Sequence, residues 1–316
     1  MNKIAFMFPG QGSQSVGMGK ELYETYPIVR ALYEEADELL GMKLSELMFN
    51  GPEENLKATE NAQPALLLSS IAVHSVLTEY GIKPDMAVGH SLGEYSALVA
   101  SGALSFQDAI RLVQKRGQLM EQAYPKGQGA MAAVLGLEQA KVEAALEQIS
   151  GDQPVDVANL NCPGQIVISG SKEGIGQAES VLKEAGAKRV KELAVSGPFH
   201  SRLMKPASEK FAAELEGITI QDPVIPMFAN VTAAPVSTAA EVKDLLIKQL
   251  YSPVRFSEAA STMIEKGASR FVELGNGKVL CGLLKKIDKS IPTYAVQDKE
   301  TLEGLAAWLK EETQNA

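Results

Sequence analysis

Short apolar runs alternate with longer amphipathic segments along most of the chain. Near the N-terminus, the apolar runs KIAFMF and DMAVGHS predict buried strands over residues 3–8 and 85–91. Apolar residues at helical spacing predict helices over residues 63–81, 92–102 and 105–123. Strands that alternate with helices in this way predict an α/β fold with a mainly parallel sheet.

The pattern changes between residues 126 and 197. Here the predicted order is strand, helix, two strands, helix and strand, which is the ferredoxin-like order. After residue 198 the α/β alternation returns, with predicted strands at 224–230 and 270–275. We therefore predict one α/β core, formed by residues 1–125 and 198–316, interrupted by a ferredoxin-like insert at 126–197. A cleft between two such parts is a favoured place for a ligand.

Composition excludes several classes of function. The net charge of −9 argues against a general nucleic-acid binder, because neutralising phosphates requires clustered Lys and Arg. Two cysteines and three histidines do not form a disulfide scaffold or a zinc-binding pattern. No apolar stretch approaches the ~18 residues of a membrane span, and the N-terminal segment does not resemble a signal peptide. We expect a cytoplasmic protein that binds neither membranes nor nucleic acid.

The pentapeptide GHSLG at residues 89–93 is the first candidate for chemistry. A predicted strand precedes Ser91 and a predicted helix follows it, as in a nucleophile elbow. At the start of that helix, the backbone N–H of Leu92 is a candidate donor to an oxyanion. On the pentapeptide alone, a strand-to-helix loop with an N-capping serine is an equally good interpretation.

A nucleophilic serine needs a base, and the chain has three histidines. His74 lies inside a predicted helix, and the side chain of His90 should diverge from its neighbour Ser91 on a sharp turn. His200 lies on a loop bearing glycine and proline just after the predicted insert, so elimination favours it. No acidic third member is evident. Glu209 and Glu273 are open alternatives, as is a backbone carbonyl that orients the base.

Five motifs occur together along the chain: FPGQGSQ (8–14), GHSLGEYSAL (89–98), QKRGQLME (114–121), GPFHS (197–201) and ELGNGKVL (273–280). In this order and spacing, the chain resembles the malonyl-CoA:acyl carrier protein transacylase family over essentially its whole length. The resemblance implies an α/β-hydrolase-like core with a ferredoxin-like insert. One departure is Asn276, where proline is common in the family.

The resemblance also implies roles for individual residues. Ser91 would be the acylated nucleophile and His200 its base. The backbone N–H groups of Gln11 and Leu92 would form the oxyanion hole, and the backbone carbonyl of Gln249 would orient the histidine.

Five further positions match residues near the cleft. Arg116 would bind the free carboxylate of the malonyl group, a contact that rejects acetyl groups because it leaves a buried cation unpaired without that carboxylate. Phe199 matches a bulky residue found where malonyl is chosen over methylmalonyl. Polar cleft positions of less defined role are matched by Gln63, Asn159 and Asn161.

The implied reaction is ping-pong acyl transfer from malonyl-CoA to acyl carrier protein by a monomer. It needs no metal or redox cofactor, since the partner carries the phosphopantetheine. Because such carriers are acidic and this chain is too, docking requires a local basic patch. The candidates are Lys188, Arg189, Lys285 and Lys286. Two alternatives remain: a free-standing malonyl transferase of polyketide synthesis, and a thioesterase that lets water complete the reaction.

Overall fold

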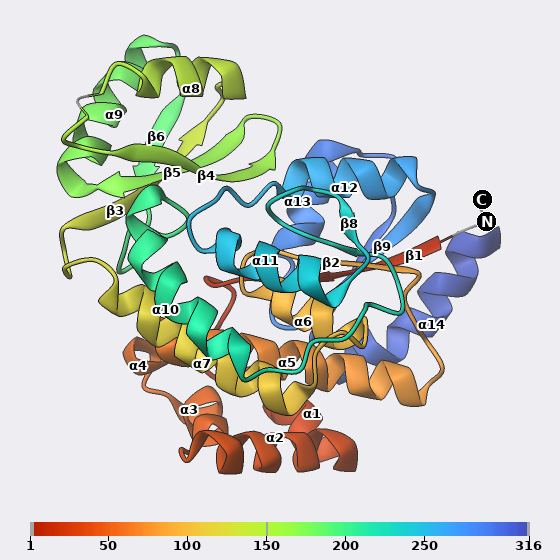
Figure 1. The fold of residues 1–316 in the computed structure, drawn as a ribbon. Helices are drawn as coiled ribbons and strands as arrows, with labels where there is room; N and C mark the ends of the chain where they lie inside the picture. The colour runs from red at the N-terminus through yellow and green to blue at the C-terminus, as the bar shows by residue number, and fades with distance from the viewer. Residues whose placement is uncertain (1–2, 150, 315–316) are drawn as a thin grey trace.

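The computed structural model describes residues 3–149 and 151–314, which form two β-sheets with helices around them (Figure 1). The larger sheet has the strand order β10-β9-β1-β2-β7-β8, and all its pairs are parallel except β7 with β8. Its strands are β1 (Lys3–Phe8), β2 (Met86–Gly89), β7 (Met227–Phe228), β8 (Pro235–Val236), β9 (Ala268–Leu274) and β10 (Thr293–Val296).

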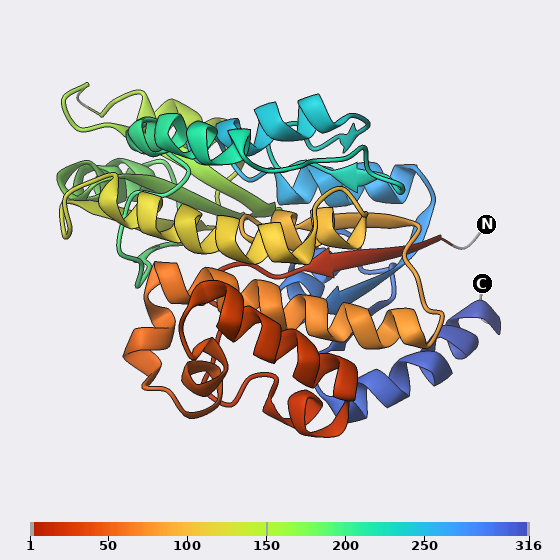
Figure 2. The same cartoon turned by 60° about the horizontal axis from the view of Figure 1, so that its bottom comes forward.

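Helices cover both faces of this sheet, as Figure 2 shows. Alternate residues of β1 point to opposite faces, as strand geometry requires. Phe6 and Phe8 pack in one apolar cluster with α5 (Thr59–Glu79) and α6 (Gly93–Ala100). Ala5 and Met7 belong to a second cluster with α12 (Phe256–Glu265) and α13 (Val279–Ile287). A central strand buried on both faces explains why KIAFMF is almost entirely apolar.

Most of the predicted elements of the core are present, with shifted ends. The helix predicted from residue 63 begins at Thr59 and contains Pro64. The sequence pattern did not indicate the helices that precede it, nor α12 or the edge strands β8 and β10. The remaining helices are α1 (Lys20–Thr25), α2 (Pro27–Leu40), α3 (Leu44–Asn50), α4 (Glu53–Lys57), α7 (Phe106–Gln122), α10 (Lys205–Glu216), α11 (Ala239–Gln249) and α14 (Lys299–Gln314), with a 3₁₀ turn at Arg202–Met204.

The smaller sheet is antiparallel, with the strand order β4-β5-β3-β6. Together with its two helices this order is the ferredoxin-like arrangement, so the predicted fold class is confirmed. Its elements are β3 (Gly129–Leu135), α8 (Gln139–Leu146), β4 (Val155–Cys162), β5 (Gln165–Ser171), α9 (Lys172–Glu184) and β6 (Arg189–Glu192). They lie within the predicted insert, whose outer boundaries at 126 and 197 stay a prediction.

The two faces of the smaller sheet have different neighbours. Ala130, Ala132 and Val134 of β3 pack against α8 and α9. Met131 and Ala133, which alternate with them, line a cavity between this sheet and the core. The side chains on this second face therefore form one wall of the cavity.

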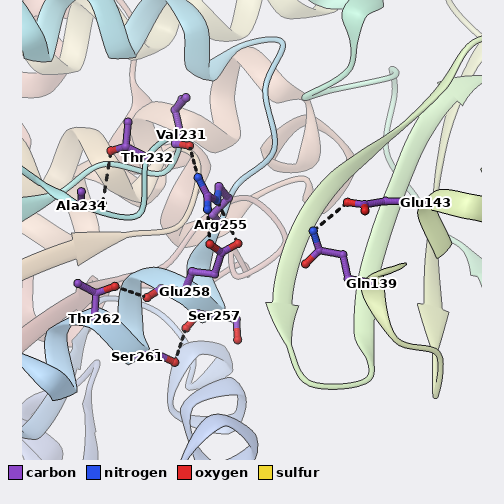
Figure 3. Close-up of polar contacts among 10 residues, drawn as sticks. All are labelled: Gln139, Glu143, Val231, Thr232, Ala234, Arg255, Ser257, Glu258, Ser261 and Thr262. Carbon is purple, nitrogen blue, oxygen red and sulfur yellow. Dashed lines mark hydrogen bonds and ion pairs between the residues drawn. The ribbon is translucent and has the colours of Figure 1, made fainter. Parts of the chain in front are cut away.

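A short backbone connection joins the smaller sheet to the core. The Val254 N–H donates to Ala158 O (2.8 Å), and the Leu160 N–H donates to Val254 O (2.9 Å). The next residue, Arg255, pairs with Glu258 of α12 and donates to Val231 O, as Figure 3 shows. Strand β4 is thus tied directly to the segment that leads into α12.

Within the described ranges, no helix combines the length and apolar character needed to cross a bilayer.

Candidate active site

Ser91 lies on the turn between β2 and α6, at the carboxyl edge of the larger sheet. Its φ of 52° is in the left-handed region, which a non-glycine residue adopts rarely and at a cost. The turn packs tightly against the end of β1: a Cβ on Gly93 would overlap Phe8 O, and one on Gly10 would overlap His90 O. This crowding explains the glycines of both motifs, and the strand–turn–helix geometry is that of a nucleophile elbow.

Ser91 and His200 are in direct contact. Ser91 Oγ lies 2.7 Å from His200 Nε2, and His200 Nδ1 lies 2.8 Å from the backbone carbonyl oxygen of Gln249. Because a carbonyl can only accept, Nδ1 carries the proton of the neutral imidazole, and Nε2 offers its lone pair to the serine. The three residues therefore form a Ser–His–carbonyl arrangement without an acidic member.

Burial keeps His200 neutral. Its side chain is 4% exposed, and desolvation lowers the pKa of His200 to about 3, assisted by the nearby positive charge of Arg116. The hydrogen bond to Gln249 opposes this shift of the pKa but is outweighed. A neutral imidazole is the form that can accept a proton from a serine hydroxyl.

Arg116, on α7, is fully buried beside Ser91. Its guanidinium donates to Gln63 Oε1 (2.8 Å), Gln249 Oε1 (2.9 Å) and Ser91 Oγ (3.2 Å). It also lies 5.3 Å from the centre of the Tyr95 ring. Desolvation lowers the pKa of Arg116, whereas Tyr95 and then Glu94 act to raise it. None of its three hydrogen-bond acceptors is a carboxylate, so a carboxylate-bearing ligand would supply the missing direct counter-charge.

Hydrogen bonds link the Ser91 turn to two residues that the sequence did not single out, directly to Asn230 and through it to Glu94. The Asn230 side chain accepts from the Ser91 N–H (2.8 Å) and donates to Gly89 O (2.7 Å), so it braces both sides of the turn. Glu94 is 1% exposed, and desolvation raises its pKa to about 7. The position of Asn230 just after β7, the neighbour of β2, is the signal that could have identified it, since ligand-side residues gather where parallel strands end.

Of the two predicted oxyanion donors, Gln11 lines the cavity beside Ser91, and Leu92 is buried next to Ser91 in the chain. Gln11 follows β1 in the glycine-rich turn, and Leu92 follows Ser91 at the start of α6. Within the described residues, neither backbone N–H has a protein acceptor. Both groups are therefore available to an oxygen atom bound beside the serine.

The cavity in front of Ser91 has a volume of about 320 Å³. Phe199, Asn159 and Asn161 line it, as predicted for residues near the cleft. Asn161 Oδ1 also lies 2.8 Å from His90 Nε2, so that histidine points away from Ser91. Gln63 is not on the cavity wall; it lies behind Arg116 and supports it.

The other proposed partners of the serine lie elsewhere. His74 is on α5, where it meets the Phe6 ring edge-on. Glu273 caps the start of α13, accepting from the N–H groups of Leu280 and Cys281. Glu209 is exposed on α10. None of these side chains contacts His200. The described residues also contain no group of three or more His, Cys, Asp or Glu side chains arranged to hold a metal ion.

The candidate basic residues are exposed but differ in their position. Lys286 Nζ lies 3.5 Å from Oε1 of Gln165, which lines the cavity. Lys285 instead faces a separate groove beside Trp308. Lys188 and Arg189 lie at the start of edge strand β6. The cavity lies beyond the opposite end of this strand, where Leu193 lines it.

Comparison with known proteins agrees with this geometry. A family model described as "Acyl transferase domain" matches residues 5–316. The chain belongs to the acyl transferase family. The "Malonyl CoA-acyl carrier protein transacylase" of Bacillus subtilis (strain 168) is 53% identical over 317 residues, covering all of both chains. The resemblance inferred from the five motifs is therefore confirmed.

Solved structures of this acyl transferase's relatives share its fold. An acyl carrier protein S-malonyltransferase from Vibrio cholerae superposes with a TM-score of 0.94 at 44% identity, covering 96% of this chain and 100% of that one. A malonyl-transacylase solved in complex with its type II PKS acyl-carrier protein has a TM-score of 0.94 at 43% identity, covering 96% and 98%.

The neutral state of His200 generates a prediction. From pH 8 down to pH 5, its imidazole should keep the ¹⁵N shifts of a ring protonated at Nδ1, because its pKa is lowered to about 3. In an unfolded chain the ring binds a proton near pH 6.5. His200 therefore favours folding fully above pH 6.5, and this contribution is lost as the pH falls toward the folded pKa.

Selective histidine labelling with NMR detection measures this directly, and His200→Asn identifies the resonance among the three histidines. A titration midpoint between pH 6 and 7 for His200 would contradict the prediction.

Proposed function

We propose that this protein transfers the malonyl group from malonyl-CoA to the phosphopantetheine thiol of acyl carrier protein, through a malonyl-Ser91 intermediate. One observation carries the proposal: Ser91 Oγ lies 2.7 Å from a neutral base and 3.2 Å from a buried guanidinium. The site thus combines a nucleophile with a recognition group for a carboxylate. The names of the relatives support the same substrate and acceptor.

In the first half-reaction, Ser91 Oγ attacks the thioester carbonyl while His200 Nε2 takes its proton. The negative charge moves to the carbonyl oxygen, where the N–H groups of Gln11 and Leu92 stabilise it. Collapse of this intermediate breaks the carbon–sulfur bond. The proton held by His200 passes to the departing sulfur, so CoA leaves as a thiol and malonyl remains as an ester on Ser91.

The second half-reaction reverses these roles with a different thiol. The phosphopantetheine thiol of the carrier gives its proton to His200 and attacks the malonyl-serine ester. The same oxyanion site stabilises the intermediate, and Ser91 recovers its proton from His200 as the ester bond breaks. Each half-reaction returns the imidazole to its neutral form, which suits a ring whose pKa is far below 7.

Arg116 supplies the selectivity in this proposal. A guanidinium has five N–H groups, and three hydrogen bonds leave two available. The carboxylate of malonyl can bind such donors in parallel, whereas acetyl leaves the buried cation without a counter-charge. Selection by Phe199 against one methyl group would be weaker, about 1–3 kcal/mol.

The two alternatives differ in the acceptor. A thioesterase would use the same serine and base and release free malonate, so the lifetime of the acyl-enzyme without a carrier distinguishes it. A transferase of polyketide synthesis would perform the same chemistry with another carrier. The relative solved with a type II PKS carrier protein keeps that pathway open as the second candidate.

Removing the nucleophile tests the proposal. Ser91→Ala should abolish the mass increase of one malonyl group that malonyl-CoA produces on the intact protein, because no other hydroxyl of the described residues is paired with His200. The control is Ser101→Ala, which removes a buried hydroxyl bonded to Leu98 O near the far end of the same helix and should leave labelling intact. Persistent labelling of the Ser91 variant would disprove the assignment. In the unsubstituted enzyme without carrier protein, loss of the label to water within one turnover time would indicate a thioesterase.

Removing the guanidinium tests the origin of selectivity. Arg116→Ala should lower kcat/KM for malonyl-CoA at least ~100-fold, the size expected for two charge-assisted hydrogen bonds, and should affect acetyl-CoA far less. Acylation of Ser91 by each thioester, followed by mass spectrometry, measures both. Arg111→Ala on the exposed side of the same helix is the matched control. An unchanged malonyl preference in the Arg116 variant would rule out this clamp.

Carrier docking is proposed at the cavity mouth near Lys286. Lys286→Glu should raise KM for acyl carrier protein several-fold, because it reverses a charge facing an acidic partner. Its neighbour Lys285 faces another groove, so Lys285→Glu should have a smaller effect. Steady-state kinetics at low salt with varied carrier measures the difference. Equal effects of the two substitutions would place docking elsewhere, with Lys188 and Arg189 as the next candidates.

A further inference from the structure

Glu94 is a buried carboxylate that the proposed transfer reaction does not use. It lies on the first turn of α6, three residues after the nucleophile. Its Oε2 accepts from the Asn230 N–H (3.0 Å) and from Gln249 Nε2 (2.7 Å). A carboxylate without water must accept hydrogen bonds from the protein, and here both donors belong to residues that contact the nucleophile turn.

The bond from Gln249 determines which way that side-chain amide points. Gln249 Nε2 donates to Glu94 Oε2 and also to Ser91 O (3.0 Å), and neither the ionised Glu94 carboxylate nor the carbonyl oxygen can donate. The NH₂ end of the amide is therefore fixed toward them, because an amide oxygen in that place would face two other oxygens. The other end, Oε1, consequently faces Arg116 Nη2 at 2.9 Å.

This orientation matters for Arg116, which can only donate. If the amide were reversed, an NH₂ group would face the guanidinium and Nη2 would lose an acceptor in a fully buried position. The guanidinium would then shift relative to Gln63 and Ser91, its other two partners. Even a small displacement of a group that positions the substrate is enough to lower the reaction rate strongly.

We propose that Glu94 is a positioning residue for the carboxylate clamp: by fixing the Gln249 amide, it aims Arg116 at the acyl group. The inference rests on the proposed function, in which Arg116 binds the malonyl carboxylate. Glu94 itself touches no reacting atom. Its contact is with the side chain of Gln249, whereas the backbone carbonyl of the same residue orients His200.

Glu94 also supports the nucleophile through Asn230, whose side chain braces the Ser91 turn. Loss of this second contact should slow acylation by every thioester alike. The clamp contact, in contrast, concerns only substrates with a carboxylate. The ratio of kcat/KM for malonyl-CoA to that for acetyl-CoA therefore isolates it, and this ratio also cancels any change in the fraction of folded enzyme.

The experiment measures that ratio at pH 8 for Glu94→Ala and Glu94→Gln in the full chain. Glu94→Ala should lower the ratio about tenfold, the size of one hydrogen bond to a charged group. Glu94→Gln keeps an acceptor oxygen of similar reach and should restore the ratio to within about twofold of the unsubstituted enzyme. A folded Glu94→Ala enzyme with an unchanged ratio would overturn the inference, as would a Gln variant as impaired as the Ala variant.

A double-mutant cycle tests whether the effect passes through Arg116. In the Arg116→Ala background, Glu94→Ala should change the ratio by less than about twofold; a further tenfold fall there would overturn the inference. If Arg116→Ala alone leaves the ratio unchanged, the clamp itself is wrong and the inference falls with it. If Arg116→Ala lowers the ratio and Glu94→Ala does not, only the role of Glu94 is wrong.

A control and a second variant complete the design. Asp37, a buried carboxylate bonded to Ser45 of α3, is the control: Asp37→Ala should lower the melting temperature and leave the ratio unchanged. Gln249→Met removes the amide but keeps the backbone carbonyl that faces His200. Gln249→Met should lower the ratio by as much as is expected for Glu94→Ala, and it provides the test if the Glu94→Ala chain does not fold. A normal ratio in Gln249→Met would overturn the inference.

Discussion

The hydrogen bond between His200 Nδ1 and the backbone carbonyl of Gln249 is the contact on which the site depends. It selects the tautomer, points Nε2 at Ser91 and replaces the acidic residue of a Ser–His–Asp triad. In the proposed reaction, a carbonyl does this without adding a buried negative charge beside the malonyl group, which already carries one. The side chain of the same residue accepts from Arg116, so one position at the end of α11 contacts both the proposed base and the proposed carboxylate clamp.

The strained turn at Ser91 depends on a second set of buried groups. A φ of 52° is maintained because the surrounding structure determines it: Asn230 holds the Ser91 N–H, and Gln249 holds the Ser91 carbonyl. Amides suit this task because each offers a donor and an acceptor in a fixed plane. The result is a rigid network in which Arg116 is buried among neutral partners, a costly arrangement that a stable fold tolerates when it serves recognition.

Much of the fold, and part of the candidate site, was predictable from the sequence. The central strands β1 and β2 and the helix α7 follow from their apolar patterns, and the ferredoxin-like order follows from the succession of elements. The pairing of Ser91 with His200 followed from the scarcity of histidines, and the roles proposed for Arg116 and Gln249 came from the family resemblance. The edge strand β8 was not predicted, because a strand of two residues leaves almost no periodicity in the sequence. The helices before α5 were not indicated either.

Glu94 and Asn230 were not identified from the sequence as residues of the site, for a different reason. They are 136 residues apart in the chain, and each has an ordinary sequence context: an acidic residue on the first turn of a helix and an asparagine at the end of a short strand. Their importance comes from burial and from the direction of each donor, which no local pattern encodes. Long-range polar contacts of this kind are determined by tertiary packing.

The smaller sheet has a consequence for how such an enzyme can change over evolution. Its inner face supplies one wall of the cavity, while every group that contacts Ser91 Oγ comes from the larger core. Substitutions at Met131 or Ala133 can therefore reshape the cavity without replacing Ser91, His200 or Arg116. The wall that the smaller sheet contributes can therefore vary in sequence while the groups that hydrogen-bond to Ser91 Oγ stay the same.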